Sequence, residues 1–166
     1  MRKILLVNIL AILVTSAFAQ IDVNYKTPDP AIKKLAEAPL APVVLVDESA
    51  ENMILLQRAL FTTIKELSDE EYRLAGLRIN PRTNGQSRTR YYENVILKKL
   101  GSSDEIQVKG LPANPKLGNF GWSPDFTKTA FTHDGESGIE LWVLNISTAE
   151  ARRISDPILN DVFRGN

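Results

Sequence analysis

The single histidine is the first residue to consider as a catalytic group. His133 precedes Asp134, and several serines lie within a few residues of it. A working Ser–His–Asp set needs these residue types, but it also needs an oriented nucleophile and an oxyanion hole. His133 falls in an expected turn between two strands, where a lone histidine is usually solvated. We therefore expect no catalytic residue in this chain.

A run of three acidic residues is the next candidate, either for a metal site or for a paired acid and base. Asp69, Glu70 and Glu71 are consecutive. Consecutive residues of a helix point in different directions, so they cannot converge on one ion. With Ser68 as N-cap and Glu71 as its capping-box partner, the pattern predicts a short helix over 69–75. We expect these acids to be solvated at its positive end.

A group of arginines follows the acidic run. Arg78, Arg82, Arg88 and Arg90 lie close together, next to the pair Tyr91-Tyr92. Guanidinium groups bind carboxylates as bidentate forks, so this group is a candidate for gripping an anionic peptide group. The substrate-contact hypothesis is assigned to Arg78, Arg82 and Arg88. The alternative is that they are ordinary solvated loop residues.

Composition excludes several other kinds of site. The 166 residues include 20 Lys plus Arg and 20 Asp plus Glu, so the formal net charge is zero. Neutrality argues against a nucleic-acid partner, which normally requires a clustered basic excess. The chain has no cysteine, which excludes disulfides, thiolate metal sites and a cysteine nucleophile. We expect neither a metal nor another cofactor.

The first residues carry the pattern of an export signal. Arg2 and Lys3 precede an apolar run over 4–14, and small residues follow at Ala17 and Ala19. This predicts a signal peptide over 1–19 that is cleaved before Gln20, and hence a periplasmic or extracellular location. An uncleaved anchor is the alternative, but the apolar run is well short of the roughly 20 residues needed to span a bilayer. We expect no membrane span in the mature chain.

The sequence after residue 19 predicts mainly short strands and turns. Residues 20–42 read as an extended, proline-punctuated lead-in with one short helix over 31–38. After it, short runs of Val, Ile, Leu and Phe alternate with Gly, Pro, Asn, Asp and Ser. This pattern predicts a mainly β fold.

An internal repeat organises these strands. Four strands in a meander are expected over 113–156, with a turn at Ser123-Pro124-Asp125. Leu45 aligns with Trp122 at an offset of 77 (122 − 45), and Ile96 aligns with Trp142 at an offset of 46 (142 − 96). The difference predicts an insertion at about 58–88 within a first copy over 43–112. A four-stranded repeat of about 45 residues is typical of a propeller blade, with a generic β-sandwich as the alternative.

One group of residues in the second repeat resembles the motif of a known family. The motif consists of Trp122, Ser123, Pro124, Asp125, Phe131 and Trp142. It resembles the repeat of TolB-type propellers, which also precede the catalytic domain in the prolyl-oligopeptidase class of serine peptidases. Segments 74–81, 83–85 and 87–88, together with 110–112 and 151–154, are similar to the glutamyl-endopeptidase-like branch of that class. The resemblance implies two four-stranded blades of a partial β-propeller, with 157–166 leading toward a further blade.

The same resemblance implies that the chemistry lies elsewhere. Such peptidases carry their serine in a Gly-x-Ser-x-Gly turn of an α/β-hydrolase domain, and this sequence has no such motif. We expect a fragment, inactive alone, whose propeller would gate the access of peptides or unfolded polypeptides to a catalytic domain. The alternative is a stand-alone exported module that binds a peptide or protein. Two open blades leave strand edges exposed, so self-association is also expected.

Overall fold

The computed structural model describes residues 26–163, so the expected cleavage residues Ala17, Ala19 and Gln20 lie outside the described part. The chain divides into two units, Met1–Ala38 and Pro39–Asn166. In the described part of the first unit, α2 (Pro30–Ala36) begins after Asp29, whose carboxylate accepts a hydrogen bond from the Ala31 amide at 2.8 Å. Proline at the first helical position suits this start, since its missing N–H has no partner there anyway. The short helix expected over 31–38 is therefore present.

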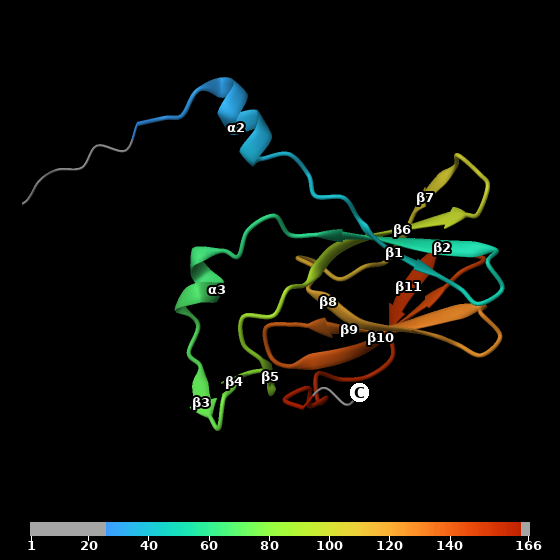
Figure 1. Cartoon of the computed structure of the whole chain (residues 1–166). Coiled ribbons are helices and arrows are strands. Elements are labelled where there is room, and N and C mark those ends of the chain that lie inside the picture. Colours follow the sequence, from blue (N-terminus) through green and yellow to red (C-terminus); the bar gives the residue numbers. More distant parts are fainter. Residues whose placement is uncertain (1–25, 164–166) are drawn as a thin grey trace, which may run out of the picture. The chain divides into compact units, whose positions relative to one another are not determined.

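The second unit is built from two antiparallel meanders (Figure 1). The first meander comprises β1 (Val43–Val46), β2 (Asn52–Arg58), β6 (Tyr92–Lys99) and β7 (Glu105–Gln107). The second meander comprises β8 (Leu117–Trp122), β9 (Lys128–Asp134), β10 (Ile139–Asn145) and β11 (Glu150–Arg153). The prediction of a mainly β, antiparallel chain is confirmed.

Strands β6 and β8 join the two meanders into one sheet. Tyr92 of β6 pairs with Leu117 of β8, and through this pair seven strands form the order β1-β2-β6-β8-β9-β10-β11, while β7 pairs with β6 off this path. Within the described residues no sheet closes on itself. The meanders also share one hydrophobic core, in which Ile54 and Phe131 are completely buried. Burial of this apolar surface is the main force that holds the two meanders together.

Strand registers show that the two meanders are copies of one structural unit. The turn from Asp47 to Asn52 is closed by the amide of Asp47 bonding the carbonyl of Asn52, at 3.1 Å. The turn from Ser123 to Lys128 is closed by the same bond, at 2.9 Å. Corresponding positions are 76 residues apart (123 − 47). In the later strands Ile96 pairs with Gln107 and Trp142 pairs with Arg153, both at an offset of 46 (142 − 96; 153 − 107).

The expected alignment of Leu45 with Trp122 is therefore wrong by one residue. Val46 pairs with Met53 beside the first turn, and Trp122 pairs with Thr129 beside the second, so Val46 is the true counterpart of Trp122. The later offset of 46 agrees with the structure. The sequence alignment failed because it matched apolar residues with apolar residues, and a shift of one residue moves every side chain of a strand to the other face.

This shift has a structural meaning. The buried face of the second meander carries Thr129, Phe131 and Leu144, whose counterparts in the first meander, Met53, Leu55 and Lys98, lie outside the shared core. Side chains alternate between the two faces of a strand. The first meander therefore buries one face of the common unit in the core, and the second meander buries the other face. The meanders consequently pack front to back.

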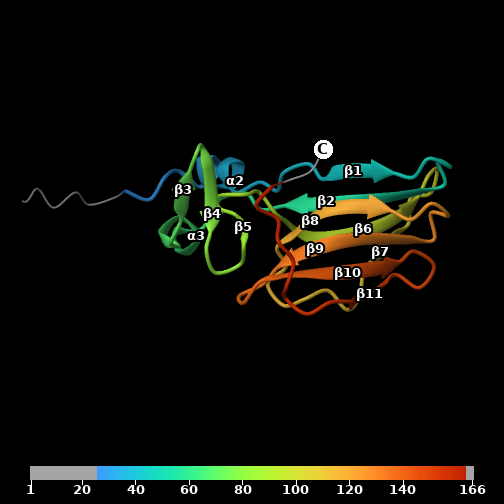
Figure 2. The same cartoon turned by 90° about the horizontal axis from the view of Figure 1, so that it is seen from below.

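The insertion lies between β2 and β6, over residues 59–91. It contains α3 (Ile64–Ser68) and a small sheet of β3 (Tyr72–Leu74), β4 (Leu77–Asn80) and β5 (Gly85–Gln86). Figure 2 shows these elements gathered at one end of the meander strands. The insertion therefore leaves the four-stranded pattern of the first meander intact.

The prediction of a helix over 69–75 is wrong. A capping box is present, but it joins Thr63 to Glu66, so α3 starts earlier and Asp69 is its C-cap. Residues 72–74 instead form β3, which turns into β4 through Ala75 and Gly76, both with positive φ. Two residues in the left-handed region are the requirement of a tight hairpin turn, and glycine meets it without strain.

Candidate functional site

The centre of the insertion is a carboxylate surrounded by three guanidinium groups. The Glu71 carboxylate forms ion pairs with all three: its Oε1 lies 2.8 Å from Arg73 Nη2, its Oε2 lies 3.1 Å from Arg88 Nε, and its Oε1 also contacts Arg78 Nη1. Its side chain is only 12% exposed. Partial burial by itself would raise the pKa of Glu71. The hydrogen bond from Arg73 and the charges of Arg78 and Arg88 outweigh burial and hold the pKa below its usual range.

Glu71 also solves a problem created by the small sheet. Arg73 of β3 and Arg78 of β4 are direct cross-strand partners. Like charges directly opposite one another destabilise a strand pair. Glu71 lies next to β3 in sequence and places one oxygen, Oε1, against both guanidinium groups. The acid predicted to be a solvated helix residue is thus an internal counter-ion, and that prediction is wrong.

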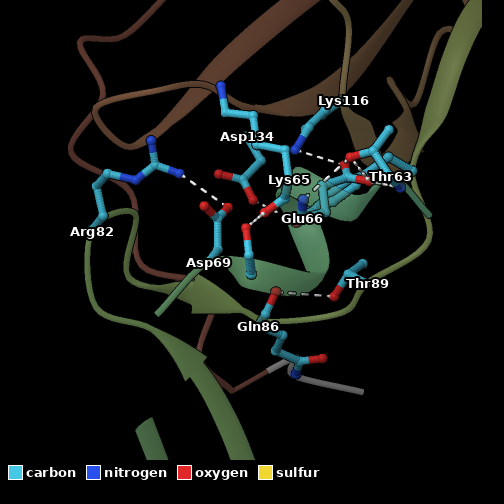
Figure 3. A network of polar contacts seen from close by, with 11 residues as sticks. Thr63, Lys65, Glu66, Asp69, Arg82, Gln86, Thr89, Lys116 and Asp134 are labelled. Carbon is cyan, nitrogen blue, oxygen red and sulfur yellow. Dashed lines mark hydrogen bonds and ion pairs between the residues drawn. The ribbon is translucent and has the colours of Figure 1, made fainter. Parts of the chain in front are cut away.

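Two further ion pairs hold the insertion in place, and Figure 3 shows both. Asp69 Oδ2 lies 3.3 Å from the Arg82 guanidinium within the insertion. Glu66 Oε1 lies 2.7 Å from Lys116 Nζ, which precedes the second meander. Burial acts to raise the pKa of Glu66, but hydrogen bonds from Lys116 and Thr63 lower it overall. These groups line a polar cavity of about 40 Å³ that Arg88, Tyr91 and Asp134 also border.

Asp134 of β9 brings the second meander to the lining of this cavity. The Tyr91 hydroxyl donates to Asp134 Oδ2, while Lys116 Nζ lies 5.6 Å from the centre of the Tyr91 ring. Asp134 Oδ1 is buried and has no hydrogen-bond partner within residues 26–163. Water is the natural partner for such an atom, because a polar cavity of this size holds ordered water readily.

His133 is neither in a turn nor solvated, which corrects the expectation from sequence. It belongs to β9, is 8% exposed, and its Nδ1 lies 3.2 Å from Glu140 Oε2. Glu140 also accepts hydrogen bonds from Trp142 Nε1 at 2.9 Å and from Arg153 at 3.1 Å. Burial would raise the pKa of Glu140, but the donors Trp142, His133 and Arg153 lower it overall. Among the hydrogen bonds of the described residues, the partner of the His133 ring is Glu140.

The predicted blade motif occupies two places. Ser123 and Asp125 lie in the turn between β8 and β9, where the Ser123 hydroxyl donates to Asp125 Oδ1 at 2.6 Å. That bond, together with those from the Thr127 hydroxyl and amide, lowers the pKa of Asp125 to about 2. Pro124 lies in the same turn. The aromatic members occupy the core region: Phe131 is fully buried, and Trp122 and Trp142 pack against the core.

The structure brings the predicted arginines together but engages each of them internally. Arg78 and Arg88 meet at Glu71, and Arg82 pairs with Asp69. A carboxylate ligand would have to compete with these internal acids. The sequence reasoning missed Arg73 as a member of the cluster and Lys116 as its link to the second meander. Arg73 could have been found from the alternation in a strand, but nothing local points to Lys116.

No group of three or more histidine, aspartate or glutamate side chains in residues 26–163 is placed to hold a metal ion. The helices of the same part of the chain are too short or too polar to cross a membrane.

Comparisons with known proteins point to a peptidase-related chain. The chain is 28% identical over 153 residues to a probable chloroplastic glutamyl endopeptidase of Oryza sativa subsp. japonica, and 28% identical over 155 residues to the Arabidopsis thaliana protein of the same name. These alignments cover 84% and 86% of the chain but only 16% of each relative, so the chain spans about a sixth of their length. No family model matches the chain, and no solved structure matches it.

Proposed function

We propose that this chain is the front part of a longer exported serine peptidase, and that its two meanders are the first two blades of a β-propeller. In the complete enzyme the propeller would gate the access of peptides or unfolded polypeptides to a separate catalytic domain. The alignments support the peptidase relationship, and the much greater length of both relatives supports the idea of a larger protein. The chemistry itself would belong to that other domain.

The observation that carries the propeller proposal is the front-to-back packing of the meanders. The core face of the first meander carries Ile54, Leu56, Val95 and Leu97, all buried. Their counterparts on the outer face of the second meander are Ala130, Thr132, Leu141 and Val143, which are half-buried. The outer face of the second meander is thus the same face of the repeated unit as the core face of the first meander. Successive blades of a propeller pack by continuing such a repeat around a central axis.

This proposal assigns structural rather than catalytic roles to the polar groups of the chain. Glu140, the acidic partner of His133, is shared with Trp142 and Arg153, which ties His133 into the sheet. Acyl transfer requires a serine, a base and an oxyanion hole in one place. We therefore propose that the isolated chain is inactive.

The experiment that tests the proposal is an immunoblot of fractionated native cells. An antibody raised against residues 26–100 would be combined with a fluorophosphonate probe, which labels activated serines covalently. We expect a band several times larger than the 18.5 kDa of this chain, outside the cytoplasm and labelled by the probe. N-terminal sequencing of that band is expected to begin at Gln20.

Two other outcomes of this experiment would contradict the proposal. A band near the calculated mass that the probe leaves unlabelled would overturn the peptidase proposal. The remaining hypothesis would then be a stand-alone exported module that binds a peptide or a protein. A band retained in the cytoplasm with Met1 intact would overturn export, whatever its size.

A further inference from the structure

The shared core uses each face of the repeated unit once. The first meander contributes the face that carries Ile54 and Leu97, which we call the front. The second meander contributes the opposite face, which carries Phe131 and Leu144 and which we call the back. The front of the second meander and the back of the first meander lie outside this core. We call these two surfaces the open front and the open back.

The open front is a contiguous area on β9 and β10. Ala130 pairs with Val143 and Thr132 pairs with Leu141, so the four side chains form two adjacent rows on one face of the sheet. All four are half-buried. At the border of this area, the Thr132 hydroxyl accepts a hydrogen bond from Asn119 at 3.1 Å. The open front is therefore mainly apolar, with a polar end.

The open back is a contiguous area on β1, β2 and β6. Val46 pairs with Met53 and Val44 pairs with Leu55, and residues two apart on a strand lie on the same face. Leu55 also pairs with Ile96 of β6, which extends the area across the sheet. Val44 and Val46 are 49% and 45% exposed. This row of apolar side chains is thus accessible from one side of the first meander.

The chain carries both halves of an interface that it already forms internally. Leu55 in the open back corresponds to Phe131, which is buried in the core, at an offset of 76 (131 − 55). Ala130 in the open front corresponds to Ile54, also buried in the core, at the same offset (130 − 54). An open back that packs on an open front would therefore repeat the arrangement of the core. Stacked repeats bury their apolar faces against neighbouring repeats in this way.

A second copy of the chain is the occupant that this relation indicates. Each copy presents an open back to the open front of its neighbour, and in the core a front meets a back rather than another front. We propose that the open front of one chain docks onto the open back of a second copy, head to tail. The contact is heterologous, so copies add to one another until a ring closes or a filament forms.

This proposal goes beyond the proposed peptidase and does not rest on it. It concerns the chain by itself, and it is carried by the strand registers and by the two open faces. The contact is expected to be weaker than the core, because Ala130 and Thr132 stand where the first meander has Ile54 and Leu56. Smaller side chains bury less apolar area at the centre of the contact. We therefore expect a dissociation constant of about 10–100 μM.

The test is sedimentation velocity of the mature chain over a range of concentrations. The average mass of the mature chain is expected to rise with concentration. Val143→Glu places a charge in the open front, and Val46→Glu places one in the open back. Because burying an unpaired charge is costly, each variant alone is expected to associate at least about tenfold more weakly than the parent chain.

Mixing the two variants distinguishes head-to-tail contact from every symmetric one. The Val143→Glu chain retains its open back, and the Val46→Glu chain retains its open front. An equimolar mixture is therefore expected to form a dimer of one chain of each kind. The dimer is expected to grow no further, because the two faces that remain free in it are the altered ones.

A matched control and a check of folding make the result specific. Ile64→Glu changes an isoleucine of α3 that is 86% exposed and lies on neither open face, and it is expected to leave association unchanged. Val143 pairs with the exposed Arg152 of β11, which offers a counter-charge to the new carboxylate. Val46 is 45% exposed. Both variants are thus expected to keep the circular dichroism spectrum and the urea midpoint of a folded chain.

Three results would overturn the proposal. One is a parent chain that stays monomeric over the whole concentration range. Another is unchanged association of both variants, which would place the contact at the strand edges instead. The third is a mixture that stays monomeric like its two components, which would mean that one symmetric contact contains both residues. These results do not alter the size or the labelling of the native band, so the two proposals fail separately.

Discussion

Ala50 and Phe126 occupy the same position in two turns that lie 76 residues apart (126 − 50), and both have left-handed backbone, with φ of 55° and 54°. Each is the fourth residue of a six-residue turn between paired strands. Their amides bond the carbonyls of Asp47 and Ser123 at 3.0 and 2.9 Å. The two turns share no residue type at these positions, so the backbone geometry is the common feature.

Replacing Ala50 with glycine is expected to stabilise the chain. A non-glycine residue in the left-handed region is strained, and Ala50→Gly should raise the free energy of unfolding by about 0.5–1 kcal/mol after the greater freedom of the unfolded chain is counted. Ala130→Gly, within β9, should lower it by about 0.5–1 kcal/mol. Urea denaturation measures both. A loss of stability in Ala50→Gly would contradict the geometry of this turn.

Asp125 is expected to make the second turn sensitive to acid. Hydrogen bonds from Ser123 and Thr127 lower its pKa from 3.8 to about 2 in the folded chain. Because the folded pKa is the lower one, the ionised group stabilises the fold above 3.8, and this contribution is lost as the pH falls toward 2. Asp125→Asn should be less stable than the parent chain near neutrality, and the difference should shrink across that range.

The measurement for this prediction is urea denaturation of both chains at several pH values. Asp104→Asn, in the loop after β6, serves as a control for the exchange of an aspartate for an asparagine. Other carboxylates contribute to the acid sensitivity of both chains equally, so only the difference between the two is informative. A constant difference down to the lowest pH would show that the Asp125 charge is unimportant.

Gly110 is expected to tolerate no side chain. Its φ is 75°, and a β-carbon there would lie 2.5 Å from the carbonyl oxygen of Ala151. This is where the segment after β7 pairs with β11, through Lys109 and its bonds to Ala149 and Ala151. Gly110→Ala should lower the free energy of unfolding by about 1–3 kcal/mol. Gly121→Ala, whose β-carbon would meet nothing within 4 Å, should change it by less than about 0.5 kcal/mol.

Removing the charge of Glu71 is expected to loosen the insertion without unfolding the meanders. Glu71→Gln leaves the cross-strand pair Arg73 and Arg78 without its counter-ion, so local opening should become more frequent. Trypsin should then cut after Arg73, Arg78 or Arg88 several-fold faster. Glu70→Gln, at an exposed neighbour, is the matched control. Mass spectrometry of the fragments gives the cleavage sites, and equal cleavage rates would contradict the role of Glu71.

Local features of this fold were predictable from sequence because they depend on neighbouring residues. Asp29 and Pro30 start α2, and the short apolar runs form the strands that their pattern predicts. The helix in the insertion was misplaced for an equally local reason. Thr63 with Glu66 and Ser68 with Glu71 are both capping-box patterns, and only the first is used. The sequence by itself does not rank two equivalent caps.

The candidate site was less predictable because its contacts cross long distances. The sequence by itself determined that the chain is mainly β and antiparallel, since alternation and turn hydrogen bonds act over a few residues. Only the tertiary structure decided which face of each meander is buried, since that depends on what packs against it. It also decided that Glu71 gathers its arginines, which requires the insertion to fold, and that Glu66 meets Lys116, which requires the insertion and the start of the second meander to come together.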